Sequence, residues 1–291
     1  MEPITLQALG TTWWVELFHT MSTERRDGLQ ASISTLLLSI ETRFSRFRPD
    51  SLVSELNTKR TLCTDDTDLA TLIGIGRDLY RHTRGNFNIL IGDELLARGY
   101  DAEYSLQVIE RPVAIGNPLT DLDYSDGAWQ LTTGLLDLGG IGKGWAIDMV
   151  AALLTAEGVT GFLINAGGDM YGTSEQGEPI TIFLEHPTEA DTYIGTTSIQ
   201  NQGFAASSPH KRRWKTVHGE TSHIVGDTTL HDASFVIARD AVTADTLATC
   251  ALLLVPDEFA VLAAVEQVSY ATLSREPANF YRTADFPFKI L

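Results

Sequence analysis

The residue types best suited to binding an anion stand together in the segment Asp137-Leu-Gly-Gly-Ile-Gly-Lys-Gly-Trp-Ala-Ile-Asp148. Glycine lets backbone N–H groups approach an anion closely, a helix start adds favourable partial charge, and Lys143 adds a full positive charge. The spacing matches neither a dinucleotide-binding Gly-x-Gly-x-x-Gly turn nor a P-loop. On these residues alone, the segment is either a phosphate cradle or a tight structural turn.

A second segment whose residue types could bind a ligand or take part in catalysis is Thr243-Ala-Asp-Thr-Leu-Ala-Thr249. Asp245 and Thr249 are four residues apart, so they share one face of a helix that we expect over 244–254. We expect Thr243 to be its N-cap and Asp245 to lie in its first turn, where the helix dipole favours a carboxylate. A carboxylate with a hydroxyl suits Mg²⁺ or Ca²⁺ better than zinc, although simple helix capping explains the same pair.

Three further segments carry weaker signals. His223, in Thr221-Ser-His-Ile-Val225, is a candidate proton acceptor, but the chain has six other histidines. In Arg43-Phe-Ser-Arg-Phe-Arg48, aromatic residues alternate with arginine. This pattern could stack on a planar ring or form the edge of a core with solvated charges. Gly85-Asn-Phe-Asn-Ile89 is a turn that leads into an apolar run.

Together and in this order, these motifs resemble the FAD:protein FMN transferases, also called the ApbE or thiamine-biosynthesis lipoprotein family. The resemblance runs from Leu9-Gly-Thr-Thr-Trp13 to at least Leu254. Its specific parts are Asp137–Asp148, Asn165-Ala-Gly-Gly-Asp169 and Ala244–Thr249. It implies cleavage of FAD with Mg²⁺, attachment of the FMN half through its phosphate to a Thr or Ser hydroxyl of a target protein, and release of AMP.

The resemblance also implies the fold and the roles of single residues. The fold would be α+β, an ApbE-like arrangement of mixed sheets packed with helices. It would have two intimately associated subdomains in a single catalytic unit over 1–291. Implied FAD contacts are Leu9, Phe47, Asn86, Phe87, Asn88, Asp137, Lys143 and Val225. Implied Mg²⁺ ligands are Gly140 through its main-chain oxygen, Asp245, Ala248 and Thr249. The implied catalytic residues are Asp245, which holds the metal, and His223, which assists proton removal unless a metal-linked carboxylate does so.

The chain departs from the family pattern at three places. Asn88 replaces an acidic residue, and His223-Ile-Val-Gly-Asp-Thr-Thr-Leu230 lacks the proline and glycine of the family element. The signal peptide and lipid-bearing cysteine of the family are not seen. Two other functions therefore stay open: an FAD pyrophosphatase that yields FMN and AMP, and a non-enzymatic FAD-binding relative.

Charge and hydropathy restrict the partners. A net charge of −17 over 291 residues argues against nucleic-acid binding, which needs a basic face. No apolar run reaches the roughly 18 residues that a membrane span needs, so we expect no membrane insertion. The N-terminus lacks the basic and apolar regions of a signal peptide, so we expect a cytoplasmic protein. The expected partners are FAD and a flavin-accepting protein.

The elements that must position these residues are predicted from periodicity. Apolar gaps of three and four predict helices over 28–47 and 66–83, and a further helix is expected over 143–157, after the glycines. Strands are expected over 11–18, 128–132, 135–138 and 161–165. Helices and strands do not alternate regularly, which favours the α+β class.

Overall fold

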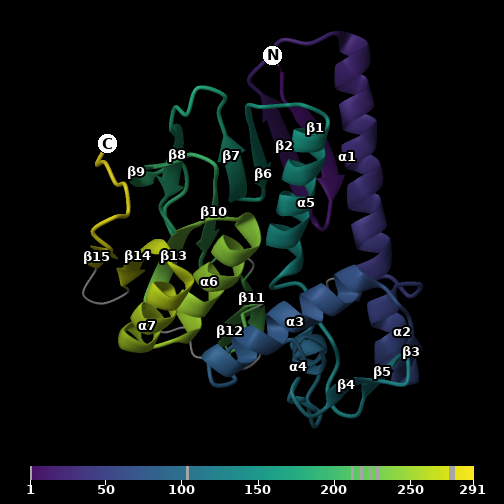
Figure 1. Cartoon of the computed structure of the whole chain (residues 1–291). Coiled ribbons are helices and arrows are strands. Elements are labelled where there is room, and N and C mark those ends of the chain that lie inside the picture. The colour runs from purple at the N-terminus through teal and green to yellow at the C-terminus, as the bar shows by residue number, and fades with distance from the viewer. Residues whose placement is uncertain are drawn as a thin grey trace. The chain divides into compact units, whose positions relative to one another are not determined.

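The computed structural model describes residues 2–102, 105–210, 213–216, 219–222, 224–226, 230–274 and 279–291. Within these residues its helices are α1 (Thr23–Phe44), α2 (Leu52–Lys59), α3 (Thr67–His82), α4 (Gly92–Ala97), α5 (Gly142–Ala156), α6 (Ala241–Leu253) and α7 (Pro256–Glu266), as Figure 1 shows. Its strands are β1 (Ile4–Ala8), β2 (Thr11–Leu17), β3 (Thr61–Cys63), β4 (Leu122–Ser125), β5 (Ala128–Leu131), β6 (Phe162–Ala166), β7 (Asp169–Thr173), β8 (Ile180–Glu185), β9 (Tyr193–Ile199), β10 (Gln202–Ser207), β11 (Arg213–Thr216), β12 (Gly219–Ser222), β13 (His231–Ala238), β14 (Ser269–Ser274) and β15 (Asn279–Arg282).

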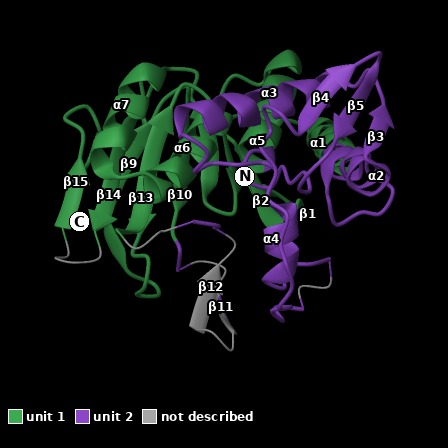
Figure 2. Cartoon of the chain, turned by 90° about the horizontal axis from the view of Figure 1, so that it is seen from below, with its two compact units in different colours: residues 1–39, 143–208, 229–291 green, residues 40–142, 209–228 purple. Residues whose placement is uncertain are grey.

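The α+β class is confirmed, and the chain divides into two compact units (Figure 2). Unit 1 comprises Met1–Ser39, Lys143–Ser208 and Thr229–Leu291, and unit 2 comprises Ile40–Gly142 and Pro209–Thr228. The glycine-rich segment crosses from unit 2 into unit 1 between Gly142 and Lys143. The candidate site residues of the sequence motifs are therefore divided between the two units.

Unit 1 is built on a sheet whose described strands have the order β1-β2-β6-β7-β10-β13-β14-β15. Every neighbouring pair in this order is antiparallel. The β1–β2 connection is a two-residue turn in which Leu9 (φ 52°) and Gly10 (φ 71°) both have positive φ. This pair of angles is typical of a type I′ hairpin turn, whose twist matches that of the strands.

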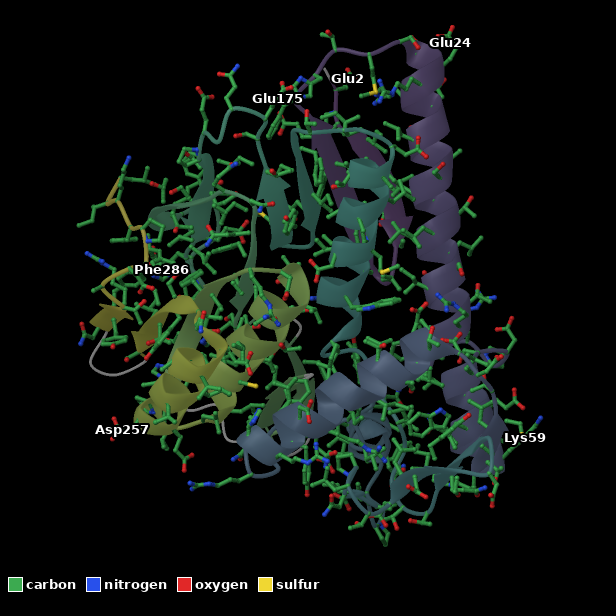
Figure 3. The ribbon with its side chains drawn as sticks, in the orientation of Figure 1. Glu2, Glu24, Lys59, Glu175, Asp257 and Phe286 are labelled. Carbon is green, nitrogen blue, oxygen red and sulfur yellow. The ribbon has the colours of Figure 1, made fainter. Side chains whose placement is uncertain are left out.

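The two faces of β13 show how the sheet is covered. Phe235 and Ile237 belong to a buried cluster with residues of β8 and β9, and Phe286, labelled in Figure 3, packs into the same cluster. Side chains alternate between faces along a strand, so Ser234 lies on the opposite face. There α6 packs against β10 and β13, and Ser234 Oγ donates a hydrogen bond to Ala248 O. The sheet thereby fixes the helix that carries Asp245 and Thr249.

Unit 2 contains α3, whose N-cap Asp66 accepts a hydrogen bond from Leu69 N, and a small sheet in the order β3-β5-β4. The predicted strand over 135–138 is wrong. The side chain of Asn57 donates to Leu136 O (2.9 Å) and accepts from Leu136 N (2.7 Å). An amide side chain thus occupies the backbone groups that a neighbouring strand would bind, and the segment stays irregular.

The other elements predicted around the motifs are confirmed with small shifts. The strand over 11–18 is β2, the strand over 128–132 is β5, and the helices over 66–83 and 143–157 are α3 and α5. The helix predicted over 28–47 is α1, which begins earlier, at Thr23, and ends at Phe44. Among the described residues no helix is long and apolar enough to cross a membrane.

Candidate active site

In unit 1, one ammonium group lies between two buried carboxylates. Lys143 Nζ donates a hydrogen bond to Asp169 Oδ2 and lies 3.2 and 3.3 Å from the two carboxylate oxygens of Asp245. Asp169 and Asp245 are each 5% exposed, while the Lys143 side chain keeps 21% of its surface in solvent. The cluster carries a net charge of −1 when all three groups are ionised. Asp169 ends the Asn165-Ala-Gly-Gly-Asp169 motif, for which the sequence predicted no individual role.

Helices α5 and α6 each bind a carboxylate of the other. Gly144 N, in the first turn of α5, donates to Asp245 Oδ2 (2.9 Å). In return, the two oxygens of Asp148 accept hydrogen bonds from Ala241 N (2.8 Å) and Val242 N (2.9 Å) at the start of α6. These backbone N–H groups have no partner inside a helix, so the carboxylate satisfies both of them. The two motifs therefore hold each other in place.

Gly144 is required by the close approach of the two helices. A Cβ atom at this position would lie 2.6 Å from Ala241 O, 2.6 Å from Val242 Cα and 2.8 Å from Asp245 Cβ. At Gly142, in contrast, an added Cβ meets nothing within 4 Å. The glycine at 144 thus allows helix packing, which the phosphate-cradle interpretation did not include.

The predicted N-cap of the second motif is wrong. Asp240, not Thr243, caps α6, and its side chain accepts a hydrogen bond from Thr243 N (2.9 Å). The helix begins at Ala241, so Asp245 lies beyond the first turn. The backbone contact that favours its negative charge comes from Gly144 at the start of α5, together with the Lys143 ammonium.

Burial and neighbouring charges shift the pKa values of these groups. Burial raises the pKa of Asp245, and the Asp169 charge adds to this effect, while Lys143 opposes it. Burial also raises the pKa of Asp148 to about 6, although the hydrogen bonds from Ala241 and Val242 act in the opposite direction. For Lys143, burial alone would lower the pKa, but the charges of Asp169 and Asp245 outweigh it and raise the pKa.

Three of the four predicted metal ligands lie together on α6. Thr249 Oγ1 lies 3.4 Å from Ser207 Oγ, and the Ala248 carbonyl oxygen accepts a hydrogen bond from Ser234 Oγ (2.6 Å). The fourth, Gly140, belongs to unit 2. In the part of the chain that the structure describes, no group of three or more His, Cys, Asp or Glu side chains is arranged to hold a metal. A metal here would also need hydroxyl and main-chain oxygens as ligands.

Leu9 lies at the same end of the unit 1 sheet as Asp169. Trp13 pairs with Ala166 at the end of β6, so the β1–β2 turn and the β6–β7 turn are neighbours. Gly167, in the β6–β7 turn, has a φ of 69°, and a Cβ there would lie 2.5 Å from Thr11 Oγ1. The two turns therefore touch, and Asp169 follows directly as the first residue of β7.

In unit 2, Asp137 and Phe47 are joined by Arg46, which sequence reasoning did not select. Arg46 Nε donates to Asp137 Oδ2, and Arg46 Nη2 donates to Tyr100 O (2.6 Å). Asp137 Oδ1 accepts from Gly139 N (2.7 Å). The guanidinium carbon lies 4.2 Å from the Phe47 ring centre, which is a cation–π contact. The core-edge interpretation of this segment expected solvated charges, but the Arg46 side chain is 7% exposed and paired with Asp137.

Two aromatic rings extend this arrangement within unit 2. The Tyr100 ring meets the Phe47 ring edge-on, with centroids 5.7 Å apart. Its stacked partner is Trp214, at a centroid distance of 5.9 Å and an interplanar angle of 13°. Trp214 Nε1 donates to Arg98 O (2.9 Å), so the residue is anchored at both its ring and its polar group. Trp214 lies far along the chain from Tyr100, so no local sequence signal could have paired them.

The predicted FAD-contacting turn is organised by its own hydrogen bonds. Asn86 is exposed, while Phe87 is buried and lies where a Cβ on Gly140 would come within 3.2 Å of its ring. The Asn88 amide donates from Nδ2 to Gly116 O (2.9 Å) and accepts at Oδ1 from Leu90 N (2.8 Å). A carboxylate could not donate to Gly116 O, so these contacts give a physical reason for asparagine at this departure from the family pattern.

The predicted catalytic residue His223 lies outside the described residues. Val225 is described and half-buried, and it follows the buried residue Ile224. The structure therefore brings together Lys143 and Asp245 in unit 1, with Ala248 and Thr249 on the same helix as Asp245, and it joins Phe47 to Asp137 through Arg46 in unit 2. Asp148, Asp169 and Arg46 are the members that sequence reasoning missed. A signal existed for Asp148 and Asp169, because each is the last residue of a glycine-rich motif in the sequence.

Comparisons with known proteins relate the chain to one family. A family model described as the ApbE family matches residues 9–272. A Vibrio cholerae protein named FAD:protein FMN transferase is 22% identical over 97% of this chain and 90% of its own length. A Haemophilus influenzae protein of the same name is 24% identical over 98% and 90%.

Solved structures share the fold. The ApbE protein of Thermotoga maritima superposes with a TM-score of 0.83 at 20% identity and covers 97% of this chain and 96% of its own. The apo form of the Pseudomonas stutzeri flavinyl transferase ApbE gives 0.78 at 21% identity, over 97% and 93%.

Proposed function

The chain belongs to the ApbE family, and on that premise we propose that it transfers FMN from FAD to a Thr or Ser hydroxyl of a target protein, releasing AMP. The relatives named above are called FAD:protein FMN transferase, and each matches this chain over 90% of its own length. We propose that residues 1–291 act as one catalytic unit in this reaction. A cytoplasmic location stays a prediction, which fractionation of expressing cells and immunoblotting would check.

The observation that carries the proposal is the cluster of Lys143, Asp169 and Asp245. Two buried carboxylates share one ammonium, so the cluster has a net negative charge and favours a further cation. Charged oxygen ligands are what Mg²⁺ prefers, so the donor set fits this ion. An ammonium beside the cation provides a second positive charge for a pyrophosphate.

The residues that would hold Mg²⁺ are Asp245 and Thr249 through their side chains and Gly140 through its main-chain oxygen. Ala248 lies beside Thr249, but its carbonyl oxygen already accepts the Ser234 Oγ hydrogen bond. When bound, the ion would offset the charge that develops as the pyrophosphate bond breaks. Lys143 binds phosphate oxygens at the same place. Thr249 contributes a hydroxyl whose neighbour is Ser207, so it is already held in a polar environment.

The other predicted contacts fit FAD groups of different chemistry. Asp137 already accepts hydrogen bonds from Arg46 and Gly139. Its remaining lone pairs can accept only from a donor, so it would bind an N–H or O–H of FAD and not a phosphate oxygen. Phe47 offers an aromatic ring to the flavin. We propose Leu9, Asn86, Phe87, Asn88 and Val225 as further contacts on the strength of the family pattern.

The transfer itself balances as a displacement at phosphorus. The acceptor hydroxyl oxygen forms a bond to the FMN phosphorus, and the bond from that phosphorus to the bridging oxygen breaks. AMP leaves with the bridging oxygen. The hydroxyl proton must go to a base, because a neutral hydroxyl is a weak nucleophile. We propose His223 for this role, with a metal-linked carboxylate as the alternative.

The test uses the full chain with FAD, Mg²⁺ and candidate acceptor proteins, followed by mass spectrometry of the acceptors. The expected result is a mass gain of FMN minus water on one Thr or Ser. Asp245→Ala should abolish the gain, while Asp257→Ala, an exposed change on α7 labelled in Figure 3, should leave it unchanged. Full activity of Asp245→Ala would refute the metal assignment.

A parallel reaction without acceptor separates the other functions. Rapid release of FMN and AMP from FAD and Mg²⁺ alone would identify a pyrophosphatase. Tight FAD binding without turnover in either reaction would identify a non-enzymatic relative. The proposed transferase predicts slow release without acceptor and stoichiometric labelling with it.

A further inference from the structure

Asp169 has a single side-chain partner among the described residues, the ammonium of Lys143. Its carboxylate is 5% exposed and comes from the first residue of β7. A buried carboxylate needs a counter-charge, and Lys143 supplies it. The sheet fixes the backbone of Asp169 through its pairing with Ala166, so the carboxylate projects from a rigid strand end.

Asp245 competes with Asp169 for the same ammonium. Lys143 Nζ lies 3.2 and 3.3 Å from its two oxygens, while Asp245 Oδ2 also accepts the Gly144 N–H bond. Without Asp169, the ammonium would have one carboxylate left and would pair with it alone. Asp245 and Lys143 would then form a neutral pair, and a metal ion would have to displace the ammonium.

We infer that Asp169 is a positioning residue that holds the Lys143 ammonium and thereby keeps Asp245 available to a divalent cation. The inference rests on the proposed function, because that function assigns Asp245 to Mg²⁺. The net charges make the role concrete. With Asp169, the cluster carries −1 before the cation binds; without it, the cluster is neutral. Replacing a residue that positions a metal-binding group without touching the metal typically weakens metal affinity about 10- to 100-fold.

The test measures Mg²⁺ binding by isothermal titration calorimetry on the full chain, without FAD. Asp169→Asn keeps the size of the side chain and removes its charge. We expect its Mg²⁺ dissociation constant to rise about 10- to 100-fold. Glu175→Gln is the matched control. Glu175 follows the opposite end of β7, projects into solvent with 58% of its side chain exposed (Figure 3), and does not contact the cluster.

The control matters because the chain has a net charge of −17, and any lost acid could weaken cation binding. An equal loss of affinity in Glu175→Gln would attribute the effect to net charge and overturn the inference. An unchanged affinity in Asp169→Asn would overturn it as well. If the unaltered chain binds no Mg²⁺ at all, the metal assignment of the proposed function fails instead, which is a distinguishable result.

A rescue experiment separates this role from structural damage. In the double variant Lys143→Met with Asp169→Asn, the ammonium that would neutralise Asp245 is absent. We therefore expect its Mg²⁺ affinity to exceed that of Asp169→Asn and to approach that of the unaltered chain, because both clusters carry a net charge of −1 with Asp245 available. Thermal unfolding in chelator confirms that each variant is folded. If Asp169→Asn does not fold, the double variant is compared with the unaltered chain, and an affinity about 10- to 100-fold weaker in the double variant overturns the inference.

Discussion

Replacing Gly144 by alanine should destabilise the protein because α5 and α6 meet at this residue. The added Cβ would lie 2.6 Å from both Ala241 O and Val242 Cα, and such close approaches to backbone atoms force the helices apart. Overpacking of this kind costs about 1–3 kcal/mol. We take the upper part of that range because two of the three contacted atoms are backbone. Alanine offsets about 1 kcal/mol through its better helix propensity. The expected net loss is about 2 kcal/mol.

Gly142→Ala is the control for this prediction, because the two glycines lie in the same helix turn but differ in the free space around an added Cβ atom. An added Cβ at Gly142 meets nothing within 4 Å, so alanine there should be neutral or stabilise by up to about 1 kcal/mol. Thermal unfolding followed by circular dichroism measures both variants. We expect Gly144→Ala to melt about 4–8 °C below the unaltered chain. If it melts at the same temperature as Gly142→Ala, the argument from helix contact is refuted.

Three further changes test other contacts, each by unfolding in urea or by heat. Asp148→Asn should remove part of the pH dependence of folding stability, because the pKa of Asp148 in the folded chain, about 6, lies above the usual carboxyl value. The free energy of unfolding of the unaltered chain should therefore fall by up to about 3 kcal/mol as the pH rises from 4 to 7. Parallel curves of unfolding free energy against pH for the two chains would contradict this. Asn88→Asp should cost about 1–3 kcal/mol, since a carboxylate would face Gly116 O without a proton to donate; an unchanged melting temperature counts against it. Arg46→Met should cost about 3–5 kcal/mol because Asp137 stays buried without its cation, with Arg46→Lys in between; equal stability of all three chains would exclude this role.

Local sequence patterns predicted most of the elements around the site and missed what depends on distant side chains. The helix over 28–47 was found from its apolar spacing, but its start was missed. Arg25 N donates a hydrogen bond to Ser22 Oγ, and the helix starts at Thr23, more than one turn before the first apolar residue of the pattern, Leu29. The prediction of a strand over 135–138 was wrong because the side chain of Asn57, 79 residues earlier, binds both the N–H and the C=O group of Leu136.

The candidate site shows the same limit. The family pattern selected Lys143 and Asp245, and the structure places them within hydrogen-bonding distance. The N-cap of α6 was assigned to Thr243, although Asp240 is an equally good cap three residues earlier; spacing alone could not choose between them. Asp240 is the cap because the Asp148 carboxylate binds the N–H groups of Ala241 and Val242, which fixes the helix start at Ala241.

The sequence of the glycine-rich segment indicated either a cradle for phosphate or a tight structural turn, and in this structure its cationic end faces protein carboxylates. Gly144 N and Lys143 both bind Asp245. A phosphate that approaches Lys143 would therefore meet a cluster of net charge −1. A cation bound at Asp245 would reverse the sign of that charge to +1, so Mg²⁺ and the pyrophosphate should each strengthen the binding of the other. Because such coupling is reciprocal, the affinity gained by one ligand must equal that gained by the other. The hydrogen bonds between α5 and α6 thus place the charges of two motifs that are distant in the sequence within direct electrostatic reach of each other.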